Sequence, residues 1–228
     1  MKKESKMLVA FLGISLLLTA TIPHADAVNS WHKGGTNQAL ISGTKELNAD
    51  VNVKTPPNQA ARDATTLYWM GGLTSNNYLT QVELRAWSST EWKVFFETVN
   101  QSTGVRTEIV QTNLNVVNAQ SVELDNRLTT SGQDCMYALR GSTQVSSCLS
   151  AVNYGTSFSK AWGEFESYDY TASDFAPMGS PIQFTDFKAY KSDGSTYFPT
   201  YSAYNNLGGP SCISATAGSG WVTITENC

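Results

Sequence analysis

The chain has 228 residues, and its 15 Lys and Arg against 19 Asp and Glu give a formal net charge of −4 at pH 7. A mildly acidic chain without basic runs is a poor binder of nucleic acid, so we expect no nucleic-acid partner. The length is sufficient for one sizeable hydrophobic core.

The first 27 residues have the form of an export signal. A basic start is followed by an apolar run at 7–22 and by Ala25-Asp26-Ala27, a small-x-small cleavage site. A membrane anchor is the alternative, but the run is short for a bilayer span and no later stretch approaches that length. We therefore expect a secreted protein, extracellular or periplasmic, with a single β-sandwich domain at 28–228. It should be monomeric and free of the membrane after cleavage.

Short strand patterns recur along the rest of the chain, whereas helix patterns are nearly absent. Residues 67–73 and 79–85 flank a turn-rich Thr-Ser-Asn-Asn patch, and 92–99 and 105–111 flank Asn-Gln-Ser-Thr-Gly. Further strands are expected at 114–124, 136–140, 157–166, 182–190 and 221–225, with a loop at 54–65. Regular short strands with Gly, Asn and Ser between them predict an all-β fold, an antiparallel β-sandwich or jelly roll.

Four cysteines follow the export signal: Cys135, Cys148, Cys212 and Cys228. An even number of cysteines in an exported chain favours two disulfides. The pairs Cys135–Cys148 and Cys212–Cys228 each close a short loop and are preferred, although the sequence leaves the other two pairings open. No two cysteines are two to four residues apart, so the spacing does not predict a zinc site.

Side-chain alternation divides two of the expected strands into faces. Val82 and Leu84 share the face expected to meet the core, so Gln81 and Glu83 point outward. A second strand, 161–167, places three side chains on one face: Trp162, Glu164 and Glu166. Two carboxylates beside a tryptophan suit a binding groove, and an ordinary solvated sheet face is the alternative interpretation.

Histidine is scarce, which restricts the catalytic mechanisms open to the chain. Only His32 remains after the export signal, so a Ser-His-Asp or Cys-His mechanism would have to use that residue. A lone histidine near a terminus is typical of a surface position. The sequence contains no G-x-S-x-G, H-E-x-x-H or P-loop motif. Any hydrolytic chemistry would therefore use carboxylates, amides or hydroxyls.

A series of segments, taken in chain order, resembles one known family. The segments are 29–31 (NSW), 49–56 (ADVNVKTP), 68–73 (YWMGGL), 79–82 (LTQV), 92–97 (WKVFFE), 161–166 (AWGEFE), 175–180 (FAPMGS), 182–185 (IQFT) and 221–225 (WVTIT). They are similar to the glutamic peptidases, or eqolisins, and this chain resembles a divergent bacterial-type member. The resemblance implies a concanavalin-like jelly roll and a protein or peptide substrate.

The resemblance also implies site residues. Gln81 falls at the family's catalytic Gln, followed by a valine where the family prefers a small residue. Glu164 falls at the catalytic Glu, and Glu166, on the same face, is the alternative. An alignment on Trp162 would instead leave alanine at the Glu position. The segments that match the family's substrate cleft contribute four aromatic residues: Trp69, Trp92, Phe96 and Trp162.

In such a mechanism the Glu carboxylate is a general base for water, and the Gln amide positions the water and donates to the oxyanion. A carboxylate base favours acid pH, and neither metal nor cofactor is expected.

Two alternatives stay open. A non-catalytic secreted jelly-roll module would bind carbohydrate or a surface partner through exposed aromatic side chains, of which the candidates are Trp87, Trp92, Trp162 and Tyr168. A different carboxylate enzyme, such as a glycosidase, would use Glu164 with Glu83 or Glu166.

Overall fold

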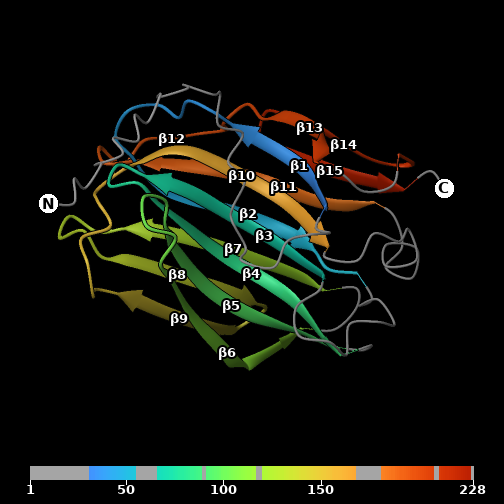
Figure 1. Ribbon diagram of the computed structural model, residues 1–228, viewed down its shortest axis with the longest axis horizontal. Coiled ribbons are helices and arrows are strands. Elements are labelled where there is room, and N and C mark those ends of the chain that lie inside the picture. The colour runs from blue at the N-terminus through green and yellow to red at the C-terminus, as the bar shows by residue number, and fades with distance from the viewer. Residues whose placement is uncertain are drawn as a thin grey trace, which may run out of the picture.

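The computed structural model describes residues 31–54, 66–88, 91–116, 120–167, 181–207 and 211–226. Every regular element in these ranges is a β-strand, and neighbouring strands pair antiparallel (Figure 1). The prediction of an all-β antiparallel sandwich is therefore confirmed.

The strands form two sheets. One has seven strands, in the order β13 (Ser202–Leu207), β1 (Trp31–Asn37), β10 (Phe158–Ser167), β3 (Thr66–Thr74), β4 (Tyr78–Ser88), β5 (Glu91–Asn100) and β6 (Arg106–Val116). The other has eight, in the order β14 (Ile213–Gly218), β15 (Trp221–Glu226), β11 (Ile182–Lys191), β2 (Thr44–Asn52), β7 (Ser121–Leu128), β8 (Asp134–Arg140) and β9 (Thr143–Leu149), with the short β12 (Thr196–Tyr197) paired to β11.

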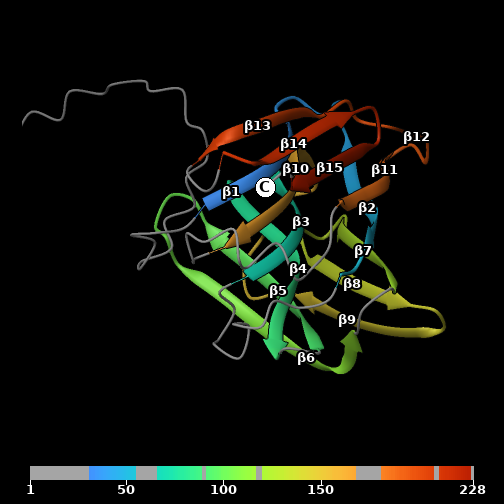
Figure 2. The same ribbon diagram turned by 90° about the vertical axis from the view of Figure 1, so that its right-hand side faces the viewer.

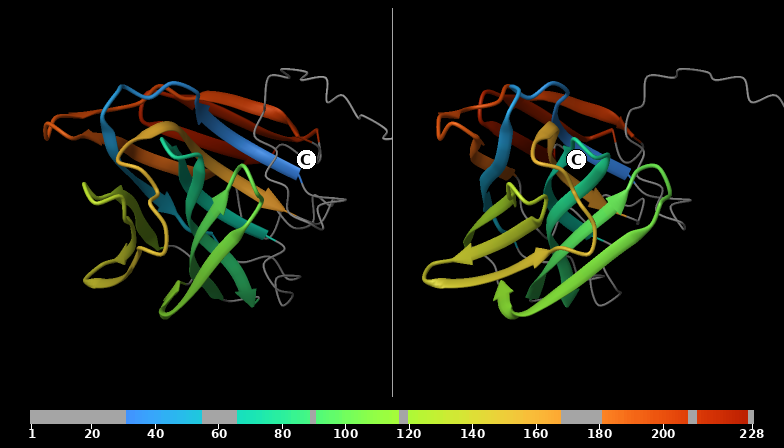
Figure 3. Two further views of the ribbon diagram at one scale, coloured as in Figure 1. Left: turned by 60° about the vertical axis from the view of Figure 1, so that its left-hand side comes forward. Right: turned by 90° about the vertical axis from the view of Figure 1, so that its left-hand side faces the viewer.

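The two sheets stack as layers and meet at both ends. Edge strand β13 contacts β14, and edge strand β6 contacts β9 (Figure 2). Figure 3 shows the twist of both layers from two further sides. Alternate side chains fill the space between the layers, as the two-residue period of a strand requires. Val82 and Leu84 of β4 are fully buried there, as the sequence predicts, together with Phe184 and Phe187 of β11.

Two predicted hairpins are present, and each turn has the backbone it needs. Asn77, with φ of 63°, turns the chain between β3 and β4, and asparagine tolerates this conformation better than most residues. Gly104, with φ of 72°, does the same between β5 and β6. These short connections fix the register of β4 on β3 and of β6 on β5.

One expected strand was drawn too long, because 114–124 is two strands. β6 ends at Val116 and β7 begins at Ser121, and the two belong to different sheets. When the apolar pattern continues through the connection between two sheets, periodicity alone does not reveal that one strand has ended and another has begun. The expected loop at 54–65 and the export signal at 1–27 lie outside the described residues, apart from Lys54.

Cys135 and Cys148 form a disulfide, as predicted. Cys212 is also disulfide-bonded, but Cys228 lies outside the described residues, so the pairing of these two stays a prediction. Among the described residues, no helix has the length and apolar character needed to cross a bilayer.

Candidate active site

The register of β10, β3 and β4 places the predicted catalytic residues on one face of the seven-stranded sheet. Directly opposite residues in antiparallel strands share a face. Glu164 lies opposite Trp69, which in turn lies opposite Glu83. In the next row, two residues along, Trp162 lies opposite Gly71, which lies opposite Gln81. Gln81 and Glu164 thus lie on the same face, two strands apart and offset by two residues.

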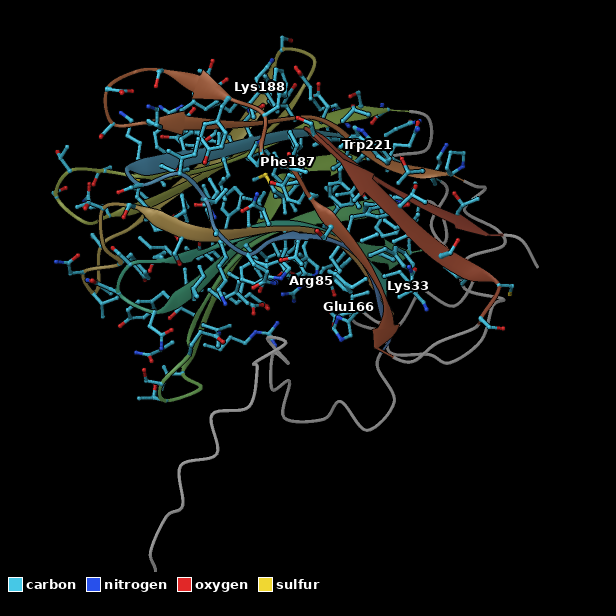
Figure 4. All side chains as sticks on the ribbon, turned by 90° about the horizontal axis from the view of Figure 1, so that it is seen from above. Lys33, Arg85, Glu166, Phe187, Lys188 and Trp221 are labelled. Carbon is cyan, nitrogen blue, oxygen red and sulfur yellow. A yellow bond between two sulfur atoms is a disulfide. The ribbon has the colours of Figure 1, made fainter. Side chains whose placement is uncertain are left out.

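This face, called the site face below, points away from the core between the sheets. Figure 4 labels Arg85 and Glu166 on this side of the molecule, Phe187 in the interior and Lys188 on the opposite side. The sequence predicted the direction of these side chains correctly but not their exposure. Gln81 is 1% exposed and Glu164 3% exposed, so polar groups on this face interact in a largely water-free environment.

A small second apolar cluster lies around Gln81 on the site face. Its buried members are Trp69, Leu79, Val99 and Trp162. The rings of Trp69 and Trp162 lie 6.4 Å apart. A Cβ on Gly71 would approach Gln81 Cγ to 3.1 Å and Trp69 Cζ3 to 3.2 Å. The side chains of Gln81 and Trp69 therefore both lie over Gly71, and any side chain at this position would collide with them.

Both oxygens of the Glu164 carboxylate have partners. The Tyr204 hydroxyl, from β13, donates to Oε2. His32, from β1, makes a hydrogen bond and ion pair with Oε1 through Nδ1, and the same nitrogen lies 3.7 Å from Glu166 Oε2. Burial opposes a charge on His32, but Glu164 and, to a lesser degree, Glu166 outweigh it and raise the pKa of the imidazole to about 9. His32 is therefore an imidazolium at neutral and acid pH.

His32, Glu164 and Glu166 also form the one group in the described part of the chain whose donor atoms are close enough to hold a metal ion. One ligand atom from each lies within 4.8 Å of the others. The geometry is that of an ion pair, however, because His32 Nδ1 hydrogen-bonds directly to Glu164 Oε1. The two atoms are therefore each other's partners, with no space between them for an ion.

Beyond Gln81, the site face carries a network of charges on β4, β5 and β6. Arg85 binds Glu83 at 2.5 Å, Glu97 at 2.7 Å and Glu108 at 2.6 Å. Burial opposes the charge of Arg85, but the three carboxylates outweigh it and raise the pKa of the guanidinium further. Arg106 binds Glu97 and Glu108 as well. Glu83 is therefore committed to a buried ion pair, and the large Trp69 lies between it and Glu164.

Two of the four predicted substrate-binding aromatics lie elsewhere. Trp92 and Phe96 point from β5 into the core between the sheets, where both are fully buried. The sequence segment does match a strand of the site, but Trp92 and Phe96 fall on the opposite face from Gln81, and the expectation that these two residues line the cleft is corrected. Trp69 and Trp162 do lie on the site face. Tyr168 is outside the described residues.

The sequence interpretation missed His32 and Tyr204. Neither β1 nor β13 was predicted, because both are short and lack clear alternation. Pairing between strands so distant in sequence cannot be read from one chain. The one indication in the sequence was chemical: the single histidine after the export signal lies two residues before a pair of glycines, Gly34 and Gly35.

The sequence matches no family profile and no curated protein. Solved structures do match. A scytalido-glutamic peptidase with a transition-state analog inhibitor has a TM-score of 0.61 at 13% identity, over 86% of this chain and 98% of that one. SCP-B, a member of the eqolisin family of peptidases in complex with the tripeptide Ala-Ile-His, has a TM-score of 0.56 at 12% identity over the same shares. The chain thus has the fold of the glutamic peptidases, and at these identities the likeness establishes the fold alone.

Proposed function

We propose that the protein is a secreted acid endopeptidase in which Gln81 and Glu164 activate water to hydrolyse peptide bonds. The observation that carries the proposal is their placement on one face of the seven-stranded sheet, with only β3 between their strands. Strand spacing and rise put their Cα atoms roughly 12 Å apart. His32 of β1 and Tyr204 of β13 hold the Glu164 carboxylate, and the proposal places the water and the peptide carbonyl between this carboxylate and the Gln81 amide.

Unpartnered polar atoms support a ligand at this position. Gln81 Oε1 and Trp69 Nε1 are buried and have no hydrogen-bond partner among the described residues. A buried polar atom without a partner costs about 1–3 kcal/mol, and such atoms call for an explanation. A hydrogen-bonding ligand between β10 and β4 would supply both an acceptor and a donor.

The reaction follows from the chemistry of the two groups. Glu164 removes a proton from water as the water oxygen attacks the scissile carbonyl carbon. The Gln81 amide donates a hydrogen bond to the developing oxyanion, a contact worth roughly 3 kcal/mol in a preorganised site. Glu164 then passes its proton to the leaving nitrogen as the C–N bond breaks. The aromatic rings of Trp69 and Trp162 bound the site on the β10 side.

One observation favours a binding module as the second candidate. Trp87 is 42% exposed, and its ring is covered on one side by Lys93 Nζ at 3.8 Å from the centroid. An indole exposed to this extent could stack on a sugar ring. Because this candidate needs no general base, it predicts no loss of function when Glu164 is replaced.

The test is digestion of a denatured protein substrate between pH 2 and pH 7. The wild type should cleave at acid pH, Glu164→Gln should be inactive, and Gln81→Ala should lose a factor on the order of hundreds. Glu166→Gln should lose less than Glu164→Gln. Matched controls are Glu91→Gln, at the start of β5, and Gln144→Ala, on β9 of the other sheet. Both positions are distant from Gln81 in the sheet register, and both variants should retain full activity.

All variants must first show the circular dichroism and melting curve of a folded protein. A folded wild type that cleaves nothing at any pH would refute the peptidase proposal, and glycan-array binding would then test the module. If Glu166→Gln is the inactive variant, the mechanism stands but the base is Glu166. The proposal of export is tested separately, by an N-terminus at or near Val28 in mass spectrometry of the secreted protein.

A further inference from the structure

We propose that His32 and Tyr204 are positioning residues that each hold one oxygen of Glu164 and together keep this carboxylate ionised at acid pH. The inference rests on the proposed function, because it assigns Glu164 the role of general base. It adds a third and a fourth residue to the two that carry the chemistry.

The backbone of β1 makes this arrangement possible. In the paired strands β13, β1 and β10, Tyr204 lies opposite Gly34, and Gly34 lies opposite Glu164. A Cβ on Gly34 would lie 3.1 Å from the Tyr204 hydroxyl and 2.5 Å from the Gly163 carbonyl oxygen. Only a residue without a side chain lets the phenol cross β1 and reach the carboxylate on β10.

His32 reaches Glu164 from the neighbouring row. It lies opposite Glu166 on β10, and its ring leans two residues along the strand to Glu164 Oε1. Its side chain is only 15% exposed, which strengthens the ion pair relative to one in water. Since Tyr204 takes Oε2 and His32 takes Oε1, the carboxylate cannot rotate. Each oxygen still has a second lone pair, so Glu164 can accept a proton from water.

The charges around His32 favour its imidazolium form. Glu164 and Glu166 face it from β10, and the neutral Tyr204 faces the same carboxylate from β13. On its own strand, Lys33 donates to the carbonyl of Asn205. The carboxylates raise the pKa of His32 to about 9 against the effect of burial. A cation beside Glu164 opposes protonation of that carboxylate, so the base stays active at lower pH.

The first experiment compares pH–activity profiles of wild type, His32→Gln, His32→Lys and Tyr204→Phe from pH 2 to pH 7. Without the cation, the acid limb of the His32→Gln profile should shift to higher pH by about one to two units. Each unit corresponds to a tenfold change in the protonation equilibrium of Glu164. Activity should then fall at least about tenfold at pH 3 and change less than about threefold at pH 6. His32→Lys should restore part of the acid activity. Lys45→Gln, which removes a positive charge from the other sheet, should leave the profile unchanged.

Tyr204→Phe should lower kcat several-fold at pH 6 with KM unchanged, because it loosens the base. It should also move the acid limb up, but by less than His32→Gln does, because it removes a hydrogen bond to the carboxylate and no charge. Two results would overturn the inference. A His32→Gln profile that superimposes on the wild type would show that the cation does not act on the base. A folded His32→Gln protein that is inactive at every pH would show that His32 takes part in the chemistry itself.

A second experiment tests the ion pair without any activity. His32 is the only histidine after the export signal, so a protein that lacks residues 1–27 contains one imidazole, whose Cε1–H resonance can be followed by NMR. Its titration midpoint should lie near pH 9 in the wild type and fall by more than one unit in Glu164→Gln. An unchanged midpoint would refute the pair. A wild type with the expected midpoint but no peptidase activity would support the pair and reject the proposed function.

Discussion

Replacement of Asp125 by Asn should stabilise the protein at neutral pH and leave its stability at acid pH nearly unchanged. Asp125 lies on β7, and its side chain is close to Glu46 and to Arg127, whose Nη2 is 3.5 Å from Oδ2. Burial and then the charge of Glu46 raise the pKa of Asp125 to about 7, against the opposing effect of Arg127. The folded protein therefore holds a proton here that the unfolded chain releases at a pH near 3.8.

The sign and size of the effect follow from this difference. The folded-state pKa is raised, so the contribution to stability is fully present below pH 3.8 and is lost as the pH rises through about 7. A shift of about three units at 1.36 kcal/mol per unit gives an upper limit of about 4 kcal/mol. Burial also raises the pKa of Asp134, so both aspartates should make the wild type less stable as the pH rises. Asp125→Asn should remove only the part of this pH-dependent loss of stability that Asp125 causes.

The assay is urea unfolding followed by tryptophan fluorescence at pH 4, 5, 6, 7 and 8. The unfolding free energy of the wild type should fall between pH 5 and pH 8, and that of Asp125→Asn should fall by about 2–4 kcal/mol less. Asp193→Asn is the matched control, because Asp193 is exposed and hydrogen bonds from Ser195 lower its pKa to about 2. Equal slopes for the wild type and Asp125→Asn, with a control that behaves as expected, would refute the reasoning.

Four further predictions concern packing, backbone and covalent structure. Trp92→Ala should cost about 3–5 kcal/mol in urea unfolding because the indole is fully buried, whereas Trp87→Ala should change stability by less than about 0.5 kcal/mol. Gly34→Ala should lower both the melting temperature and acid peptidase activity, since its Cβ would meet a backbone oxygen at 2.5 Å; wild-type values for both would contradict the close packing of β1 on β10. Cys148→Ser should lose roughly 3 kcal/mol by releasing Cys135, measured by urea unfolding without reductant. Thiol titration of the denatured, unreduced wild type should give no free thiol.

The fold was predictable from the sequence because its hairpins are local. The turn between β3 and β4 contains asparagine, and the turn between β5 and β6 contains glycine. Alternation along β4 assigns Gln81 and Val82 to opposite faces correctly. The same reasoning put Trp162, Glu164 and Glu166 on one face, as the register shows. Two-residue periodicity and turn chemistry are properties of short segments, so one chain suffices to read them.

What the sequence could not supply was pairing between distant segments. His32 meets Glu164 across 132 positions and Tyr204 meets it across 40, so both contacts depend on the order of strands in the sheet. For Trp92 and Phe96, resemblance to an aromatic segment located the strand but not its face. A shift of one residue exchanges the two faces of a strand, and a loose resemblance does not fix alignment to that accuracy.

The disulfide between Cys135 and Cys148 bears on how the protein must be made. The two cysteines lie directly opposite each other in the β8–β9 hairpin, and β9 is the last strand of its sheet. Most side chains of β9 are exposed, and only Val145 and Leu149 pack into the core, so the disulfide supplies much of what holds the strand to β8. In a reducing cytosol β9 could peel away and uncover the hydrogen-bonding edge of β8, a template for strand addition between chains. Recombinant chains should therefore form inclusion bodies in reducing cells and stay dispersed when folded under oxidising conditions.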